Sequence, residues 1–475
     1  MRPLDRREFL ARGGGGALLV ATPAELVEAL ARPLGAQPAQ SRRALRALRA
    51  AVRGPVLLPA TPGYGRARLL FNTRFDGVRP KAVVQPLDTR DVQAVVKWAD
   101  RYGVRLVPRS GGHSYAGYST LAKGVVVDLR RMRGTRVDGA SKRVAVGAGA
   151  KLIDVYAATA RRGVTVPGGT CPTVGIAGLA LGGGYGLASR KLGLTADNVR
   201  ALTIVTADGR ARRVDRSLDP DLFWACRGGG GGNFGIVTRL ELGVHRARRA
   251  AWFRITWPWS AASAAIDAWQ RFAPHAGDGL TSVLSVSTGP SVSAQGQFFG
   301  STGQLRRLLA PLTRVGGSLT VGASPYLPLL LRWAGGRSSP RSAFWAKSDY
   351  VSSPLPARAR AAIVARARSG SGAMLLDAYG GAINRVGEQD TAFVHRDQLF
   401  SIQYLSYASR SWVEGAHRAL RPYVSGQAYQ NYIDRELGSW QRAYYGANLG
   451  RLRETKKRYD PDFRFRFPQA IPPAG

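Results

Sequence analysis

A histidine stands inside a glycine-rich loop that follows a predicted strand. The loop reads Pro108-Arg109-Ser110-Gly111-Gly112-His113-Ser114-Tyr115 and continues through Gly117 and Tyr118. Glycine and serine at a strand end expose consecutive backbone N–H groups, which bind phosphate oxygens without a charged side chain. His113 would then lie beside a phosphate-bearing ligand. By itself the motif leaves open a glycine-rich turn with an incidental histidine.

A cysteine stands in a second loop of this kind. It lies in the stretch Pro167-Gly168-Gly169-Thr170-Cys171-Pro172-Thr173-Val174-Gly175-Ile176-Ala177-Gly178, which runs into Leu181-Gly182-Gly183-Gly184-Tyr185-Gly186. Glycines again let the backbone approach a flat or anionic ligand closely. The alternatives for Cys171 are a buried structural thiol or a disulfide with Cys226, the second of the two cysteines.

A third loop joins Arg227 and Gly228 to Gly232 with Asn233-Phe234-Gly235-Ile236-Val237. It fits a backbone wrapped around a ligand and feeding a strand. No G-K-[ST] follows the glycines, so it is not a Walker A loop. It also lacks the acidic residue about 20 positions on that a Rossmann dinucleotide site requires.

The charge of the chain is strongly one-sided. Lys and Arg number 69 against 30 Asp and Glu, a formal net charge of +39 over 475 residues. Such a charge attracts anions, which makes an anionic surface or polymer a candidate partner. The basic residues are spread along the chain and accompany no nucleic-acid-binding signature, so we expect no specific nucleic-acid partner. No cluster of residues with metal-ligand spacing stands out.

The first residues have the pattern of an export signal. Arg6-Arg7 is followed by Glu8, Phe9 and Leu10 and then by a weakly apolar stretch, as in a twin-arginine signal. We assign the signal to 1–39 and expect a secreted or cell-envelope protein; a basic amphipathic arm is the alternative. The apolar run is too short to span a bilayer, which takes about 20 residues, and no later stretch is a transmembrane candidate.

Residue patterns behind the signal divide the chain into three parts. Residues 40–247, with a core at 78–247, alternate β-type runs with helical ones; 89–102 is such a helix, with Thr89 as its expected N-cap. The residue pattern of 248–425 is typical of an antiparallel sheet with helices, and this range is the expected substrate domain. Residues 426–475 are rich in Tyr, Asn, Asp and Trp, unlike a frayed tail. The predicted fold class is α+β.

The three loops, in this order, resemble the berberine-bridge-enzyme-like oxidoreductases, flavoproteins with a vanillyl-alcohol-oxidase-type (PCMH-type) FAD domain that include glyco-oligosaccharide oxidases. The C-terminal segment carries the same resemblance. Its matching residues are Tyr429-Gln430-Asn431-Tyr432-Ile433-Asp434, Trp440, Tyr444-Tyr445-Gly446-Ala447-Asn448, Tyr459-Asp460-Pro461 and Gln469-Ala470-Ile471. The resemblance runs from about residue 60 to the end. It implies a two-part FAD domain, to which 426–475 returns, and a separate substrate domain.

The resemblance implies FAD attached at two points, with His113 bonded to the flavin 8α-methyl and Cys171 to C6. A disulfide with Cys226 is then excluded, and Cys226 becomes a buried free thiol. Val174 matches the position that gates oxygen in the family, where a small residue accompanies oxidase behaviour. The residues expected to bind the cofactor are Arg109, Ser110, Gly111, Gly112, His113, Ser114, Gly117, Tyr118, Gly169, Thr170, Cys171, Val174, Gly175, Gly178, Gly182, Gly183, Tyr185, Gly186, Gly235, Ile236, Val237, Tyr429 and Asn431.

For catalysis the resemblance points to tyrosines. Tyr429 matches a tyrosine that removes the substrate proton, which requires its pKa to fall from about 10. Tyr115 and Tyr185 match tyrosines that line the site, and Gln403 is expected to hydrogen-bond the substrate or the flavin. Some relatives use a carboxylate as the base, but no equivalent is evident in the sequence.

The implied activity is oxidation of an alcohol, with a sugar C1 hydroxyl as the first candidate, coupled to reduction of O2 to H2O2. The alternatives are an oxidase that tailors a secondary metabolite and a non-catalytic envelope binding protein that keeps the fold.

Overall fold

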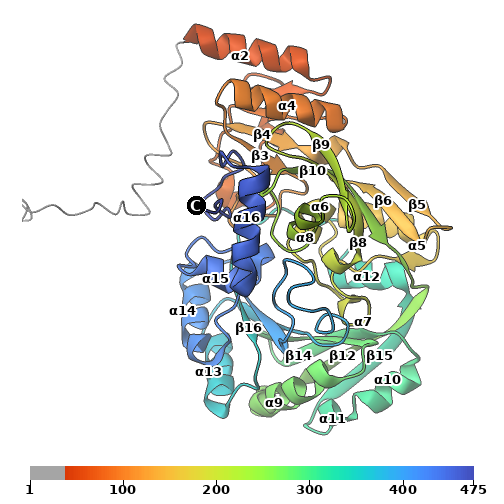
Figure 1. Cartoon of the computed structure of the whole chain (residues 1–475). Helices are drawn as coiled ribbons and strands as arrows, with labels where there is room; N and C mark the ends of the chain where they lie inside the picture. The colour runs from red at the N-terminus through yellow and green to blue at the C-terminus, as the bar shows by residue number, and fades with distance from the viewer. Residues whose placement is uncertain (1–37) are drawn as a thin grey trace, which may run out of the picture. The chain divides into compact units, whose positions relative to one another are not determined.

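Two small sheets carry the N-terminal part of the described chain, which covers residues 38–475 in this computed structural model (Figure 1). The first sheet has the order β1-β2-β4-β3 and is formed by Val56–Leu57, Ala82–Val84, Val125–Asp128 and Leu106–Arg109. The second is antiparallel, has the order β5-β6-β10-β8-β9, and is formed by Thr135–Asp138, Arg143–Gly147, Ile236–Gly243, Val199–Val205 and Ala211–Asp215. A two-stranded pair, β7 (Val164–Thr165) and β11 (His245–Arg246), lies beside them.

The strands of these sheets begin or end at the loops that the sequence singles out. The histidine loop follows β3, and the third glycine loop leads into β10. The helices of this part are α2 (Pro38–Ala51), α3 (Tyr64–Ala67), α4 (Thr89–Arg101), α5 (Leu152–Ala160), α6 (Ile176–Leu181), α7 (Ser189–Leu192) and α8 (Pro220–Ala225).

Helix α4 forms as expected, but Thr89 is not its N-cap. The cap is Asp88, whose carboxylate accepts hydrogen bonds from the backbone N–H groups of Arg90 and Asp91. An aspartate satisfies these otherwise unpaired donors and places negative charge at the positive end of the helix dipole, so it is the better cap here. Val92, Val95 and Val96 form the buried face of the helix.

A seven-stranded antiparallel sheet takes all its strands from 249–406. Its order is β15-β12-β14-β13-β17-β18-β16, formed by Ser318–Pro325, Arg249–Trp257, Val292–Phe298, Leu280–Ser287, Ala373–Ala378, Phe400–Ser406 and Trp345–Val351. The accompanying helices are α9 (Ala262–Phe272), α10 (Thr302–Leu308), α11 (Ala310–Thr313), α12 (Tyr326–Ala334), α13 (Ala357–Arg368) and α14 (Arg410–Leu420).

The two faces of this sheet have different roles. In β13, Leu284 and Val286 belong to the apolar core that the sheet shares with α9, α13 and α14. Thr281, Val283 and Ser285 alternate with them and line a cavity on the opposite face. This is the period of two that strand geometry imposes.

The C-terminal segment packs on the first part of the chain and includes α15 (Trp440–Tyr445) and α16 (Leu449–Tyr459), the latter beside α8 (Figure 1). Tyr445 donates a hydrogen bond to the carbonyl of Gly229 at 3.2 Å. The buried Lys456 ammonium donates to the carbonyl of Phe465 at 2.8 Å, to Asp460 at 2.6 Å and to the carbonyl of Asn233. The third glycine loop is therefore held by the end of the chain.

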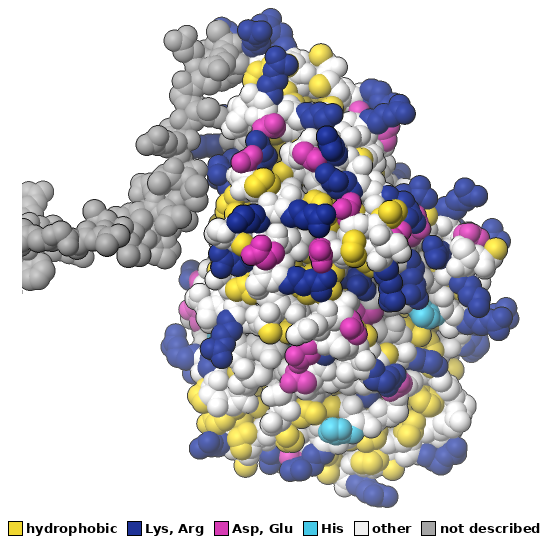
Figure 2. Space-filling model, viewed as in Figure 1, with side chains coloured by type: hydrophobic (Ala, Val, Ile, Leu, Met, Phe, Trp, Pro, Cys, Tyr) yellow, Lys and Arg dark blue, Asp and Glu magenta, His cyan; other side chains and the backbone are white. Residues whose placement is uncertain are grey.

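The predicted twin-arginine pair Arg6-Arg7 and the apolar stretch behind it lie outside the described residues. Within residues 38–475, no helix is long and apolar enough to cross a membrane. Figure 2 shows Lys and Arg side chains scattered over the visible face, with fewer acidic ones between them.

We predict that Lys456→Met lowers the free energy of unfolding by about 3 to 5 kcal/mol, because it leaves the fully buried Asp460 carboxylate without its partner. Chemical denaturation of the purified protein measures this change. Lys457→Met is the matched control, since Lys457 is exposed one position further along the same helix, and it should change the free energy little. Equal effects of the two variants would contradict a stabilising role for the buried Lys456–Asp460 pair.

Candidate active site

One cavity of about 810 Å³ lies between the glycine loops and the seven-stranded sheet. Side chains from all three loops, from the face of β13, β14, β17 and β18, and from the C-terminal segment line it. The predicted catalytic residues Tyr115, Tyr185, Gln403 and Tyr429 all line this cavity.

Most residues predicted to bind the cofactor also line the cavity. They are Ser110, Gly111, Gly112, His113, Ser114, Tyr118, Gly169, Thr170, Cys171, Val174, Gly175, Gly178, Tyr185, Gly186, Gly235, Val237, Tyr429 and Asn431. Five others are not part of its wall: Arg109, Gly117, Gly182, Gly183 and Ile236. The Arg109 side chain is buried against Asp128 at 2.9 Å and donates to the carbonyl of Arg68 at 3.2 Å. Its guanidinium therefore braces the loop from outside the cavity.

The first two loops touch through their backbones. A Cβ on Gly111 would lie 2.2 Å from the backbone N of Gly175, and a Cβ on Gly175 would lie 2.2 Å from the backbone N of Gly111. No side chain fits at either position, so only glycine permits this approach. The contact brings the loops that carry His113 and Cys171 together.

His113 and Cys171 share one neighbour. The Nε2 atom of His113 is 3.0 Å from the Thr173 hydroxyl, and the Cys171 sulfur is 3.6 Å from the same oxygen. The His113 ring also stacks on Phe71, with centroids 4.0 Å apart. Burial, with a contribution from the charge of Lys151, lowers the pKa of His113 to about 4, so the imidazole is neutral at neutral pH.

Cys171 and Cys226 do not form a disulfide with each other, as the resemblance implied. Cys226 is buried at the end of α8, and desolvation raises the pKa of its thiol to about 12, which makes it unreactive. Cys171 is partly exposed in the cavity wall.

The Tyr429 hydroxyl accepts two hydrogen bonds. One comes from the backbone N–H of Gly184 and the other from the Asn431 side-chain amide, each at 2.8 Å. These donors stabilise a phenolate, but burial outweighs them and raises the pKa of Tyr429 to about 12. The lowering that the sequence argument requires is therefore not built into the protein surroundings of this tyrosine.

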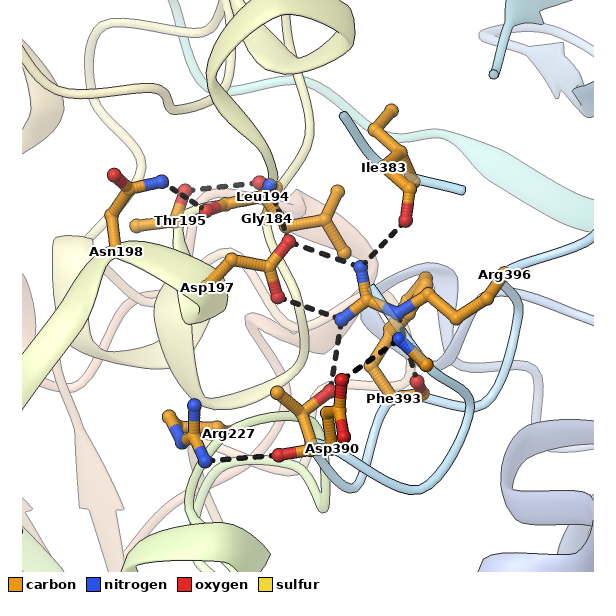
Figure 3. A network of polar contacts seen from close by, with 12 residues as sticks. Gly184, Leu194, Thr195, Asp197, Asn198, Arg227, Ile383, Asp390, Phe393 and Arg396 are labelled. Carbon is orange, nitrogen blue, oxygen red and sulfur yellow. Dashed lines mark hydrogen bonds and ion pairs between the residues drawn. The ribbon is translucent and has the colours of Figure 1, made fainter. Parts of the chain in front are cut away.

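The donor to Tyr429 is fixed by a buried ion pair (Figure 3). Arg396 makes two hydrogen bonds to the Asp197 carboxylate, at 2.7 and 3.0 Å. The turn that contains Asp197 donates from the N–H groups of Thr195 and Ala196 to the carbonyls of Gly184 and Gly183, both at 2.8 Å. The ion pair thus connects the loop after β17 to the glycines beside Tyr429.

Asp377, near the end of β17, is the site residue that the sequence reasoning missed. It lines the cavity, and the Tyr185 hydroxyl donates to its carboxylate at 3.2 Å. Burial raises the pKa of Asp377 to about 7, and the hydrogen bond from Tyr185 only partly offsets the rise. A carboxyl group with this pKa is half ionised near neutral pH, as a general base should be.

The floor of the cavity around Asp377 is neutral and polar. Register places Val283 between Gln295 and Asp377, and places Leu375 between Ser285 and Gln403. Gln403 donates to the Tyr115 hydroxyl at 2.8 Å. Amide and hydroxyl groups beside a carboxylate suit an uncharged substrate with several hydroxyl groups. Among the described residues, no three His, Cys, Asp or Glu side chains are placed to hold a metal ion.

Comparison with known proteins identifies the family of this chain. The family model for an FAD-binding domain matches residues 80–215, and the model described as berberine and berberine like matches residues 428–472. The uncharacterized FAD-linked oxidoreductase YgaK of Bacillus subtilis (strain 168) is 34% identical over 88% of this chain and 97% of its own.

Solved structures share the fold over 91% of this chain. Berberine-bridge-enzyme-like protein 1 of Physcomitrella patens is 32% identical, with a TM-score of 0.86 over 91% of this chain and 99% of that one. A chitooligosaccharide oxidase is 26% identical, with a TM-score of 0.84 over 91% of this chain and 100% of that one. The chain therefore belongs to the berberine-bridge-enzyme-like family of FAD-linked oxidoreductases.

Proposed function

We propose that this protein is an exported oxidase that removes two electrons from a carbohydrate hydroxyl, with C1 as the first candidate, and passes them through FAD to O2. The observation that carries the proposal is Asp377, a carboxyl group with a pKa of about 7 in the wall of the cofactor cavity, surrounded by neutral amide and hydroxyl groups. The similarity to a chitooligosaccharide oxidase supports the substrate class, and the twin-arginine pattern supports export.

The cavity fits FAD. Glycines from all three loops line its wall, and the Gly111–Gly175 contact, which only bare backbone permits, holds the first two loops together beside it. Two buried atoms in the wall, the Ser119 hydroxyl and the Gln430 amide nitrogen, have no hydrogen-bond partner among residues 38–475. A polar ligand can pair with both. The histidine and cysteine loops would hold the flavin, and the third loop would hold the remainder of the cofactor.

Bound FAD supplies the hydride acceptor. We infer that Asp377 takes the hydroxyl proton, because its pKa of about 7 is far better matched to this step than the pKa of about 12 for Tyr429. Tyr185 holds the carboxylate in place, and Gln403 with Tyr115 orients the sugar. Tyr429, fixed by Gly184 and Asn431, would then act as a rigid wall and hydrogen-bond donor.

We further propose that His113 and Cys171 both bond the flavin. Their common contact with Thr173 supports attachment to a single ligand. Each bond would form with the loss of one hydrogen from the His113 or Cys171 side chain and one hydrogen from a flavin carbon. The two electrons and two protons released reduce one O2 to H2O2 for each bond.

Acid precipitation tests the attachment. We expect a yellow pellet from the unaltered protein and from His113→Ala or Cys171→Ala, because one bond is enough to retain the flavin. The double variant should release its flavin into the supernatant. Complete release from the unaltered protein would disprove covalent attachment while leaving the oxidase proposal in place.

We predict that Asp377→Asn slows reduction of the flavin by substrate about 10²- to 10⁴-fold, because the amide cannot accept the proton. In the unaltered enzyme, the rate should rise with pH through about 7 as this carboxyl group ionises. Anaerobic stopped-flow absorbance with a panel of sugars measures both effects.

The exposed Asp397→Asn is the control for Asp377→Asn and should leave the rate unchanged. Tyr429→Phe separates the two candidate bases. If it abolishes reduction while Asp377→Asn does not, Tyr429 is the base. Absence of flavin after expression with ample riboflavin would favour the non-catalytic binding protein.

O2 as the acceptor predicts a role for Val174, which lines the cavity three residues after Cys171. Val174→Ile adds one methylene group and should slow reoxidation by O2 about tenfold or more, equivalent to about 1.4 kcal/mol of barrier. Reduction by substrate should change little. Reoxidation that is slow already in the unaltered enzyme would indicate a different electron acceptor.

A further inference from the structure

Thr173 contacts both residues that we propose as attachment points. Its hydroxyl oxygen is 3.0 Å from His113 Nε2 and 3.6 Å from the Cys171 sulfur. We propose that Thr173 is a positioning residue for flavin attachment, setting the direction of the His113 ring and of the Cys171 sulfur before either bond forms. This inference rests on the proposed double attachment.

The Thr173 hydroxyl can donate to His113 Nε2 or accept from it, and we propose the second arrangement. A neutral imidazole carries one N–H and one lone pair, and which nitrogen has the proton depends on the partner of the other. If Nε2 donates to the Thr173 hydroxyl, the lone pair stays on Nδ1 of His113. Nδ1 is then the nucleophile. Phe71, stacked on the ring with an interplanar angle of 19°, keeps the ring from turning.

The proton of the Thr173 hydroxyl is then free for the sulfur. A hydroxyl has one proton to donate, and its oxygen can accept at the same time. Ser339, in the loop after α12, places a second hydroxyl 3.8 Å from the Cys171 sulfur. Contacts with two hydroxyl groups, in which either partner can donate, fix the place of the sulfur in the cavity wall.

The backbone around Thr173 is held firmly enough for this role. The N–H groups of Leu152 and Ile153, at the start of α5, donate to the carbonyls of Val174 and Pro172 at 2.9 and 3.0 Å. The Gly111–Gly175 contact presses the histidine loop onto the same segment. Thr173 contributes no atom to either product bond, so its effect is on the orientation of the two attachment residues and on the position of the proton in the His113 ring.

Peptide mapping tests the inference. Trypsin cleaves after Arg109, Lys123, Arg162 and Arg190, so His113 lies in peptide 110–123 and Cys171 in peptide 163–190. In the unaltered protein, we expect one flavin to join these two peptides, detected by mass and by flavin fluorescence.

Thr173→Val keeps the shape but removes the hydroxyl. We expect the doubly joined product, at a fixed time after expression, to fall about tenfold, with singly attached or free flavin in its place. Thr173→Ser keeps the hydroxyl and should restore the joined peptides. Ser339→Ala should reduce only the bond to Cys171, leaving flavin on peptide 110–123.

The outcomes separate the two proposals. Unjoined peptides in the unaltered protein would disprove double attachment itself. Joined peptides in Thr173→Val at the unaltered level would overturn the role of Thr173 and leave double attachment standing. Bound flavin absorbance and the unfolding midpoint check that each variant folds. Thr173→Ala, compared with Thr173→Ser, makes the same test if the valine variant does not fold.

Discussion

The backbone contact between Gly111 and Gly175 is the constraint on which the site depends. A Cβ at either position would lie 2.2 Å from the backbone nitrogen of the other, far inside the normal contact distance. Two loops that leave different secondary-structure elements can therefore cross only as bare backbone. This crossing brings His113 within reach of the segment that carries Cys171 and Thr173. The N–H groups at the start of α5 and the buried pair of Arg109 and Asp128 then hold the crossing from behind.

A second constraint, the ion pair between Asp197 and Arg396, joins the glycine loops to the seven-stranded sheet. The Asp197–Arg396 pair is almost fully buried, so its strength comes from two aligned hydrogen bonds in a dry setting. Burying such a pair is costly, and here Arg396 makes further hydrogen bonds to the carbonyls of Phe393 and Ile383 and to the Thr391 hydroxyl. Its partners fix Gly183 and Gly184, and Gly184 fixes the oxygen of Tyr429. The position of Tyr429 therefore depends on groups from three distant parts of the sequence.

The sequence predicted what local patterns encode. The strand and helix periodicities predicted α4, β3 and β10, and the glycine loops predicted most of the residues that line the cavity. The N-cap of α4 shows the limit of such patterns. Asp88 and Thr89 are both suitable N-cap residues, and only the three-dimensional structure shows that Asp88 is the cap. Asp377 could not be found in this way. It stands in the apolar strand Ala373–Ala378, and its partner Tyr185 is 192 positions away in the sequence. Only the register of β17 against β13 and β18 turns this carboxylate toward the cavity.

Burial shifts the pKa values of His113 and Asp377 in opposite directions, and each shift suits the role proposed for that residue. Desolvation disfavours whichever form of a group is charged. It therefore lowers the pKa of His113 to about 4, leaving a neutral ring with a free lone pair, and raises the pKa of Asp377 to about 7, leaving a carboxylate that can take a proton. Tyr429 obeys the same rule, and its two donors cannot reverse it. A single physical cause, burial in a cavity between glycine backbone and a sheet, thus accounts for all three pKa directions on which the proposed roles of these residues depend.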